Sequence, residues 1–289
     1  MANRRTKSLL SIHLAVFLFG AAGLFGKLDL EPGVITLGRT FFASLVLLPL
    51  VLIGKNLFRS LKPRTIIVLF LSGLILAFHW WSFFYSIKIS TVAIGLVTFS
   101  TFPVFTTFIE PLVSKTRLAQ RDILLALLVF AGIVIVIPEY SFANQITEGV
   151  FFGILSGFTF SLLQVVNRKF VGDISASLLS CGQNLFAFFC LLYFMDSASL
   201  LSLHNISLVS IALLFFLGAV CTAFAHTLFI KGLETVRAQE ASIIAGLEPL
   251  YGILLAMLFL HETPHSRTIV GGFMILLAVY LSSRVGKKT

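Results

Sequence analysis

Long apolar segments recur along the whole chain and constrain its fold more than any single motif. Ten of them can be marked, at residues 8–27, 33–53, 65–87, 91–113, 122–138, 149–167, 174–195, 207–230, 237–260 and 266–284. Most have the ~17–25 residues that a helix needs to cross a hydrocarbon core of about 30 Å. Because the connections are short, the chain is predicted to be an all-α, polytopic membrane protein with ten transmembrane helices in one bundle.

Composition agrees with a membrane-embedded chain and excludes most other classes. Hydrophobic residues make up 58% of the 289 residues and charged residues only 11%, against roughly 45–50% and about 25% in soluble domains. No phosphate-binding loop, Ser-His-Asp arrangement, metal-ligand spacing or Gly-rich cofactor turn occurs in the sequence. We therefore expect no enzyme, cofactor or metal site, and we expect the membrane part to carry the function.

Lys and Arg are distributed unevenly between the two predicted sides. With the N-terminus inside, 17 of the 21 basic residues fall on the inner side, three (Lys27, Lys88 and Arg267) fall outside, and Arg39 lies within a helix. The positive-inside rule then places both termini in the cytoplasm and the protein in the inner (plasma) membrane. This topology accounts for the net charge of +9, so no nucleic-acid partner is expected, and a homodimer stays open.

Two stretches of similar sequence indicate a duplication. "VTFSTFPVFTTF" and "IIAGLEPLYGIL" align with Pro103 on Pro249, 146 positions apart, and "LGRTFFASL" aligns with "SCGQNLFAFF" at nearly the same shift. The chain then divides into two five-helix repeats, 1–144 and 145–289. Because five is odd, the second repeat enters the membrane from the opposite side. Inverted repeats of this kind are typical of transporters that work by alternating access.

These features together resemble the EamA-like family of the drug/metabolite transporter superfamily. The resemblance covers essentially the whole chain and rests on the two halves, the polar position in the second helix of each, and the prolines in "FSTFPVF" and "GLEPLYG". The second half has Glu262 in "LFLHETP", at the family's usual acidic position, whereas the first half has Thr116 where the family often has Glu. The resemblance implies a secondary transporter of small metabolites, commonly an exporter of amino acids or related compounds.

Glu248 and Pro249 stand side by side within the apolar run "IIAGLEPLYGILLAMLFL". Counted from Arg237, Glu248 lies about 16 Å along the helix, close to the bilayer midplane. A charged carboxylate at this depth costs several kcal/mol unless it is paired or protonated, and proline frees one backbone carbonyl. Glu248 is therefore a candidate to contact a substrate amine or a proton, with a structural pairing to Arg39 as the alternative. Pro103 and Pro249 are candidate hinges.

Other buried polar and aromatic residues complete the predicted site. His79 and Trp80 offer an imidazole and an aromatic face for an organic or cationic solute, and Tyr251 shares the helical face of Glu248. Gln164 has a competing structural role in holding helices together. Arg39, which is close enough to the outer surface to snorkel, has a salt bridge as its competing role. The predicted substrate-binding residues are Glu248, Tyr251, His79, Trp80, Gln164 and Arg39. A separate group near the inner edge is a candidate cytoplasmic gate: Glu110, His226, Glu240 and Arg237.

Three function classes follow from these observations. The first is a secondary transporter of a small organic metabolite, an exporter of amino acids or related compounds, with proton coupling through Glu248. The second is uptake or exchange of a larger metabolite such as a nucleoside-type cofactor. The third is an intramembrane enzyme or lipid scramblase, for which the sequence offers no reactive pair.

Overall fold

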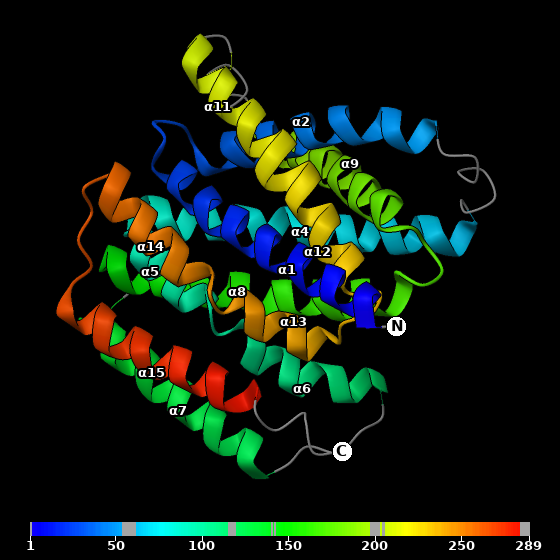
Figure 1. Cartoon of the computed structure of the whole chain (residues 1–289). Coiled ribbons are helices and arrows are strands. Elements are labelled where there is room, and N and C mark those ends of the chain that lie inside the picture. The colour runs from blue at the N-terminus through cyan, green and yellow to red at the C-terminus, as the bar shows by residue number, and fades with distance from the viewer. Residues whose placement is uncertain are drawn as a thin grey trace.

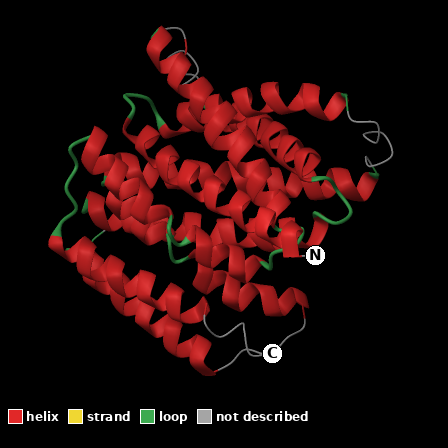
Figure 2. Cartoon of the chain, viewed as in Figure 1, coloured by secondary structure: helices red, strands yellow, loops and turns green. Residues whose placement is uncertain are grey.

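The computed structural model describes residues 2–53, 62–114, 120–139, 141, 143–196, 203 and 206–283. Every regular element in these ranges is helical (Figure 2). The elements are α1 (Ala2–Ala22), η1 (Gly23–Lys27), α2 (Pro32–Leu52), α4 (Pro63–Ile89), α5 (Val92–Phe99), α6 (Phe102–Ser114), α7 (Gln120–Val136), α8 (Gln145–Phe170), α9 (Ala176–Phe194), α11 (Leu208–Gly218), η3 (Ala219–Phe224), α12 (Ala225–Gly232), α13 (Ala238–Ala245), α14 (Glu248–Phe259) and α15 (Ser266–Ser283).

The helices begin where the sequence supplies a cap or a proline. Asn144 accepts hydrogen bonds from the backbone N–H groups of Ile146 and Thr147 at the start of α8, and Ser175 and Ser207 cap α9 and α11 in the same way. Proline occupies the first turn of α2, α4 and α14, where its missing N–H has no intrahelical partner to lose.

The all-helical membrane fold expected from the sequence is confirmed. Among the residues that the structure describes, seven helical stretches are long and apolar enough to cross a membrane, and three shorter apolar helices accompany them: Ile123–Val136, Glu248–Phe259 and Ser266–Ala278. Each apolar segment marked in the sequence falls on one helix or on consecutive helices. Side chains such as Leu10, Leu50, Phe130 and Phe273 are exposed on the outside of the bundle, as expected for a surface that faces lipid.

Two spans are interrupted near their middle. α5 ends at Phe99 and α6 begins at Phe102, while α13 ends at Ala245 and α14 begins at Glu248. The prolines expected to kink these helices instead stand at the start of the second helix of each pair, because a residue without an N–H fits a first turn better than a helix interior.

A π-helical segment interrupts a third span. η3 lies between α11 and α12 and contains Cys221 and Thr222, both fully buried. π-Helical turns of this kind are rare and occur frequently at functional sites.

Helix packing has a regular exchange pattern (Figure 1). α4 packs on α8, and the matching contact is that of α1 with α12. α4 also packs on α9, which matches the contact of α2 with α11 and η3. α5 and α6 pack on α8, and α14 and α13 pack in the same way on α1. α7 and α15 lie side by side at the edge of the bundle, and α2 lies against α9. Each contact therefore has a counterpart in which early and late helices change places.

Polar contacts between helices lie at both ends of the bundle. At one end, Arg4 pairs with Glu234 at 3.2 Å and Arg5 with Glu240 at 2.8 Å. At the other end, the Glu262 carboxylate accepts a 2.8 Å hydrogen bond from the backbone N–H of Val92, at the start of α5. The position of Thr116, where the family's acid is missing, lies outside the described residues.

Candidate functional site

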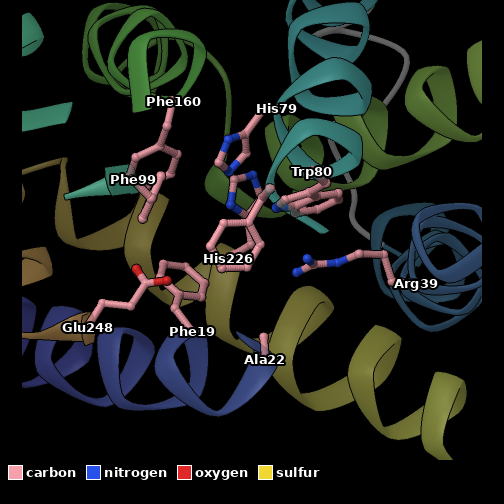
Figure 3. Close-up of a pocket in the computed structure, with 10 residues that line it drawn as sticks. Phe19, Ala22, Arg39, His79, Trp80, Phe99, Phe160, His226 and Glu248 are labelled. Carbon is pink, nitrogen blue, oxygen red and sulfur yellow. The ribbon is translucent and has the colours of Figure 1, made fainter. Parts of the chain in front are cut away.

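A small cavity in the middle of the bundle gathers most of the charged and polar candidates (Figure 3). Its walls come from α1, α2, α4, α5, α8, α12 and α14. The lining residues are Phe19, Ala22, Arg39, His79, Trp80, Phe83, Phe99, Phe160, His226 and Glu248. Glu248 and Arg39 approach the cavity from opposite sides, with aromatic rings and two imidazoles between them.

The cavity is too small for an organic solute in this conformation. The space open to the centres of water molecules is about 30 Å³, and a single water needs about 10–15 Å³ by the same measure. The site therefore has room for one or two water molecules. The structure describes a closed state of the bundle.

Glu248 is held at the break between α13 and α14. It is the first residue of α14 and is 4% exposed, so its carboxylate lies at a helix N-terminus, where the helix dipole favours negative charge. α1 approaches this turn closely, because a Cβ added to Gly20 would lie 2.9 Å from the Glu248 carbonyl oxygen. Because residue 20 is glycine, α1 can pack directly against the turn that carries Glu248.

Arg39 points into the bundle and does not reach the outer surface, which the sequence had left open. Its side chain is only 2% exposed, its guanidinium carbon lies 3.8 Å from the centre of the Trp80 ring, and its Nε donates a 3.0 Å hydrogen bond to Thr222 Oγ1. The structure, which describes both residues, shows no ion pair between Arg39 and Glu248: no guanidinium nitrogen of Arg39 lies within 4.0 Å of a Glu248 carboxylate oxygen. The cavity thus holds a guanidinium and a carboxyl group that are not directly paired.

The hydrogen bonds of His79 fix its tautomer. Its Nδ1 lies 3.1 Å from the Ser156 carbonyl oxygen and 2.8 Å from Ser156 Oγ, and that hydroxyl donates to the His79 carbonyl oxygen. A carbonyl oxygen can only accept, so Nδ1 carries the proton and Nε2 keeps a lone pair. The ring stacks on Phe160 at 5.0 Å between centroids. His79 can therefore accept a hydrogen bond from the cavity through Nε2.

His226 also lines the cavity, although the sequence placed it near the inner edge as a gate residue. It is 2% exposed, and its ring lies edge-on to Trp80 at 5.9 Å. Its Nε2 donates to Gln183 Oε1 at 3.1 Å, and Gln183 Nε2 donates to Asn167 Oδ1 at 2.6 Å. Because Nε2 carries the proton in this arrangement, Nδ1 remains an acceptor. Depth counted along one helix missed this role because it ignores which neighbours surround a residue.

Two predicted binding residues do not line the cavity. Tyr251 lies one turn beyond Glu248 and packs edge-on against Phe17 at 5.5 Å, and Gln164 lies one turn beyond Phe160 on α8 and is 1% exposed. Only an opening of the bundle would bring either to a solute. Trp81 and Tyr85 stack at 5.3 Å on another face of α4, where they line a separate groove with α2 and α9.

Phenylalanines form the rest of the wall and were not recognised from the sequence. Phe99 lies 5.4 Å from Phe83 and 5.3 Å from Phe160 between ring centroids, and Phe19 closes the side next to Glu248. With 31 phenylalanines in the chain, no pattern distinguished these rings from lipid-facing ones. Their faces give the cavity an affinity for flat or cationic groups.

No metal-binding cluster is found in the part of the chain that the structure describes. No group of three or more His, Cys, Asp or Glu side chains lies close enough together there to hold a metal ion. The cavity instead presents one cation, one carboxylate, two imidazole acceptors and aromatic faces. This set suits reversible binding of a small polar organic molecule.

A bundle of membrane-spanning helices with broken spans around a buried polar cavity defines a membrane transporter. The model of the EamA-like transporter family matches residues 6–137 and again residues 147–284. The chain therefore belongs to the EamA-like transporter family, as the sequence motifs indicated. It is a multi-pass membrane transporter of a small molecule and not an enzyme.

Named relatives cover most of the chain at low identity. An S-adenosylmethionine uptake transporter of Rickettsia prowazekii is 26% identical over 243 residues, which cover 83% of this chain and 79% of the relative. The protein of the same name from Rickettsia bellii is 27% identical with the same coverage. An uncharacterized transporter of Archaeoglobus fulgidus is 24% identical over 95% of both chains. A solved crystal structure matches with a TM-score of 0.65 at 15% identity, covering 99% of this chain and 100% of that one, which supports the fold alone.

Proposed function

We propose that this protein is a secondary transporter of small zwitterionic metabolites, an exporter of amino acids or related compounds, that works by alternating access around the central cavity. The observation that carries the proposal is the placement of Arg39 and Glu248 on opposite walls of one aromatic cavity without a direct ion pair. Buried charges are costly when unpaired, so a solute that carries both charges would compensate both.

An amino acid fits the chemistry of the cavity. Its carboxylate would bind the guanidinium of Arg39 through charge-assisted hydrogen bonds, and its ammonium would face Glu248. The acceptor nitrogens of His79 and His226 and the face of Trp80 would complete the ammonium's surroundings. Phe99 and Phe160 would contact an apolar side chain.

Three observations support alternating access by two inverted five-helix repeats, 1–144 and 145–289, with ten membrane spans in all. The helix contacts occur in exchanged pairs, one span in each part is broken just before a proline, and the family model matches the chain twice. Two similar halves give inward-open and outward-open states of similar energy. Pro103 and Pro249 are the proposed hinges.

S-adenosylmethionine is a second candidate substrate, moved inward or exchanged. The Rickettsia relatives carry this function in their names. The molecule contains the same amino-acid group, a sulfonium cation suited to aromatic faces and an adenine that stacks on them. It is larger than an amino acid, so its binding needs a wider opening of the cavity than the closed state provides.

The lysine and arginine distribution supports a location in the inner (plasma) membrane with both termini in the cytoplasm. A cysteine at Ser141 should then react with an impermeant thiol reagent added to intact cells, and one at Gly172 should not. Reversed labelling would refute this topology. No nucleic-acid partner is proposed, and assembly as a homodimer is left to a mass measurement of the detergent-solubilised protein.

Flux into proteoliposomes tests the function directly. Purified protein is reconstituted with an outward or inward gradient of radiolabelled methionine, phenylalanine or S-adenosylmethionine, and an Arg39→Met variant serves as the matched control. The proposal predicts saturable flux of at least one of these zwitterions that the variant loses. Equal flux in wild type, variant and empty liposomes would refute it.

A further inference from the structure

The π-helical segment η3 stands directly beside Arg39, and Thr222 connects the two. Thr222 Oγ1 accepts the hydrogen bond from Arg39 Nε at 3.0 Å and donates its own proton to the Leu217 carbonyl oxygen at 2.8 Å. That carbonyl lies five residues earlier, which is the π-helical spacing. The hydroxyl has one proton, and the Leu217 carbonyl takes it, so the oxygen lone pairs face Arg39.

Close helix packing brings α2 to this turn. A Cβ added to Gly218 would lie 2.9 Å from the Arg39 carbonyl oxygen and 2.5 Å from Phe42 Cβ. Glycine therefore allows the backbone of α2 to touch the end of α11 at the residue that carries the guanidinium. The wider π-helical turn that follows directs Thr222 at Arg39 Nε.

The bond to Nε leaves the other end of the guanidinium for the cavity. The guanidinium is held at two points, by the hydrogen bond from Nε to Thr222 and by the contact of its carbon with the Trp80 ring, 3.8 Å from the ring centre. Figure 3 shows its terminal nitrogens directed into the cavity. A guanidinium fixed in this way presents its N–H groups to a carboxylate with little loss of conformational entropy on binding.

We propose that Thr222 is a positioning residue that holds Arg39 ready to bind the substrate's carboxylate, and so sets the preference for acids over the corresponding amines. This inference rests on the proposed function for the identity of the anion. The positioning itself depends only on the contacts between Thr222, Arg39 and Trp80.

Tryptophan emission tests the positioning without any substrate. The chain has two tryptophans, so a Trp81→Phe background leaves Trp80 as the only tryptophan, which is excited at wavelengths that tyrosine does not absorb. A cation held over its ring perturbs the emission. Arg39→Met defines the emission of Trp80 without the cation. In this background, Thr222→Val should move the emission maximum towards that of Arg39→Met, while Thr222→Ser, which keeps the hydroxyl, should match the parent.

Thr40→Val is the matched control. Thr40 is a fully buried threonine on α2 whose hydroxyl bonds only to the carbonyls of Thr36 and Leu37. Its valine variant removes a buried hydroxyl beside Arg39 without touching the guanidinium. We expect parental emission from Thr40→Val. Emission of Thr222→Val equal to the parent, or a shift of equal size in Thr40→Val, would overturn the proposal.

Transport gives the second readout. Proteoliposome flux is compared for methionine and S-adenosylmethionine and for the decarboxylated analogue of each. Thr222→Val should raise KM for the transported acid by about tenfold and leave KM for its amine unchanged, with Thr222→Ser near wild type. A KM that rises equally for acid and amine would overturn the proposal. If wild type moves none of the four compounds, the proposed function fails, and the emission experiment still decides the role of Thr222.

Discussion

The two broken spans have the same backbone interruption but opposite chemistry at it. In α13 and α14 the residue before proline is Glu248, at the edge of the cavity, whereas in α5 and α6 it is Phe102. Phe102 is fully buried, with Phe99 at 4.9 Å and Phe160 at 5.1 Å between ring centroids. One break therefore carries a carboxyl group and the other supports the aromatic wall. The two breaks share a backbone form, and a single residue makes them chemically different.

The largest effect is expected when Phe102 is replaced by an acidic residue and Glu248 by an apolar one. Phe102→Glu buries a carboxylate among phenylalanine rings, and we expect it to lower the free energy of unfolding by about 3 kcal/mol. Phe102→Leu keeps the site apolar and should cost about 1–2 kcal/mol. Glu248→Leu should leave the folded yield near wild type and abolish flux. Thermal unfolding in detergent and proteoliposome flux measure both effects, and equal stability of Phe102→Glu and Phe102→Leu would contradict the comparison.

Replacing each proline should show that transport depends more on the break at Pro249 than on the break at Pro103. Alanine restores an N–H at the start of α6 or α14 and favours a continuous helix. Pro249→Ala should lower flux per folded molecule by about tenfold, because it displaces the turn that carries Glu248. A tenfold decrease corresponds to an effective barrier that is about 1.4 kcal/mol higher. Pro103→Ala should lower it less. Flux normalised to folded protein is the measurement, and unchanged flux in both variants would leave the prolines as packing features.

The smallest difference, in KM, is expected between variants of the two glycines at which a neighbouring helix packs against each break. A Cβ on Gly20 would meet the Glu248 carbonyl oxygen at 2.9 Å, and a Cβ on Gly157 would meet the Phe99 carbonyl oxygen at 2.7 Å. Both alanine variants should lose about 1–3 kcal/mol of stability through overpacking. Only Gly20→Ala should also change the KM of the transported zwitterion, by about threefold. A larger KM change in Gly157→Ala would contradict the asymmetry.

Sequence reasoning predicted the apolar segments well because a bilayer requires long apolar helices, and this requirement is local in sequence. The breaks at Pro103 and Pro249 were located because proline lacks the N–H that a helix interior needs, although their form as separate helices was not predicted. Glu248, His79 and Trp80 were selected because charge and aromatic clusters are rare at such depth.

The rest of the cavity depends on which helices become neighbours, and this is not local. For Arg39 the sequence left a salt bridge, substrate binding and a position at the outer surface open, whereas the structure shows it in contact with Trp80 and Thr222 from two other spans. His226 was placed at the edge by counting depth along one helix. The π-helical turn of η3 has no sequence signature in this chain, and its effect on Arg39 emerges only when α2 and α11 pack together.

The central claim is that Glu248, which lies at one of two similar helix breaks, takes part directly in substrate or proton binding. Glu248→Gln retains the size and hydrogen-bonding capacity of the side chain and removes its charge and titration. In proteoliposomes that carry the transported zwitterion, flux is measured with and without an imposed pH gradient. The account predicts that Glu248→Gln inserts and folds normally and loses either substrate binding or the dependence of flux on the pH gradient. Wild-type affinity, rate and pH dependence in Glu248→Gln would contradict it and make Glu248 a structural residue.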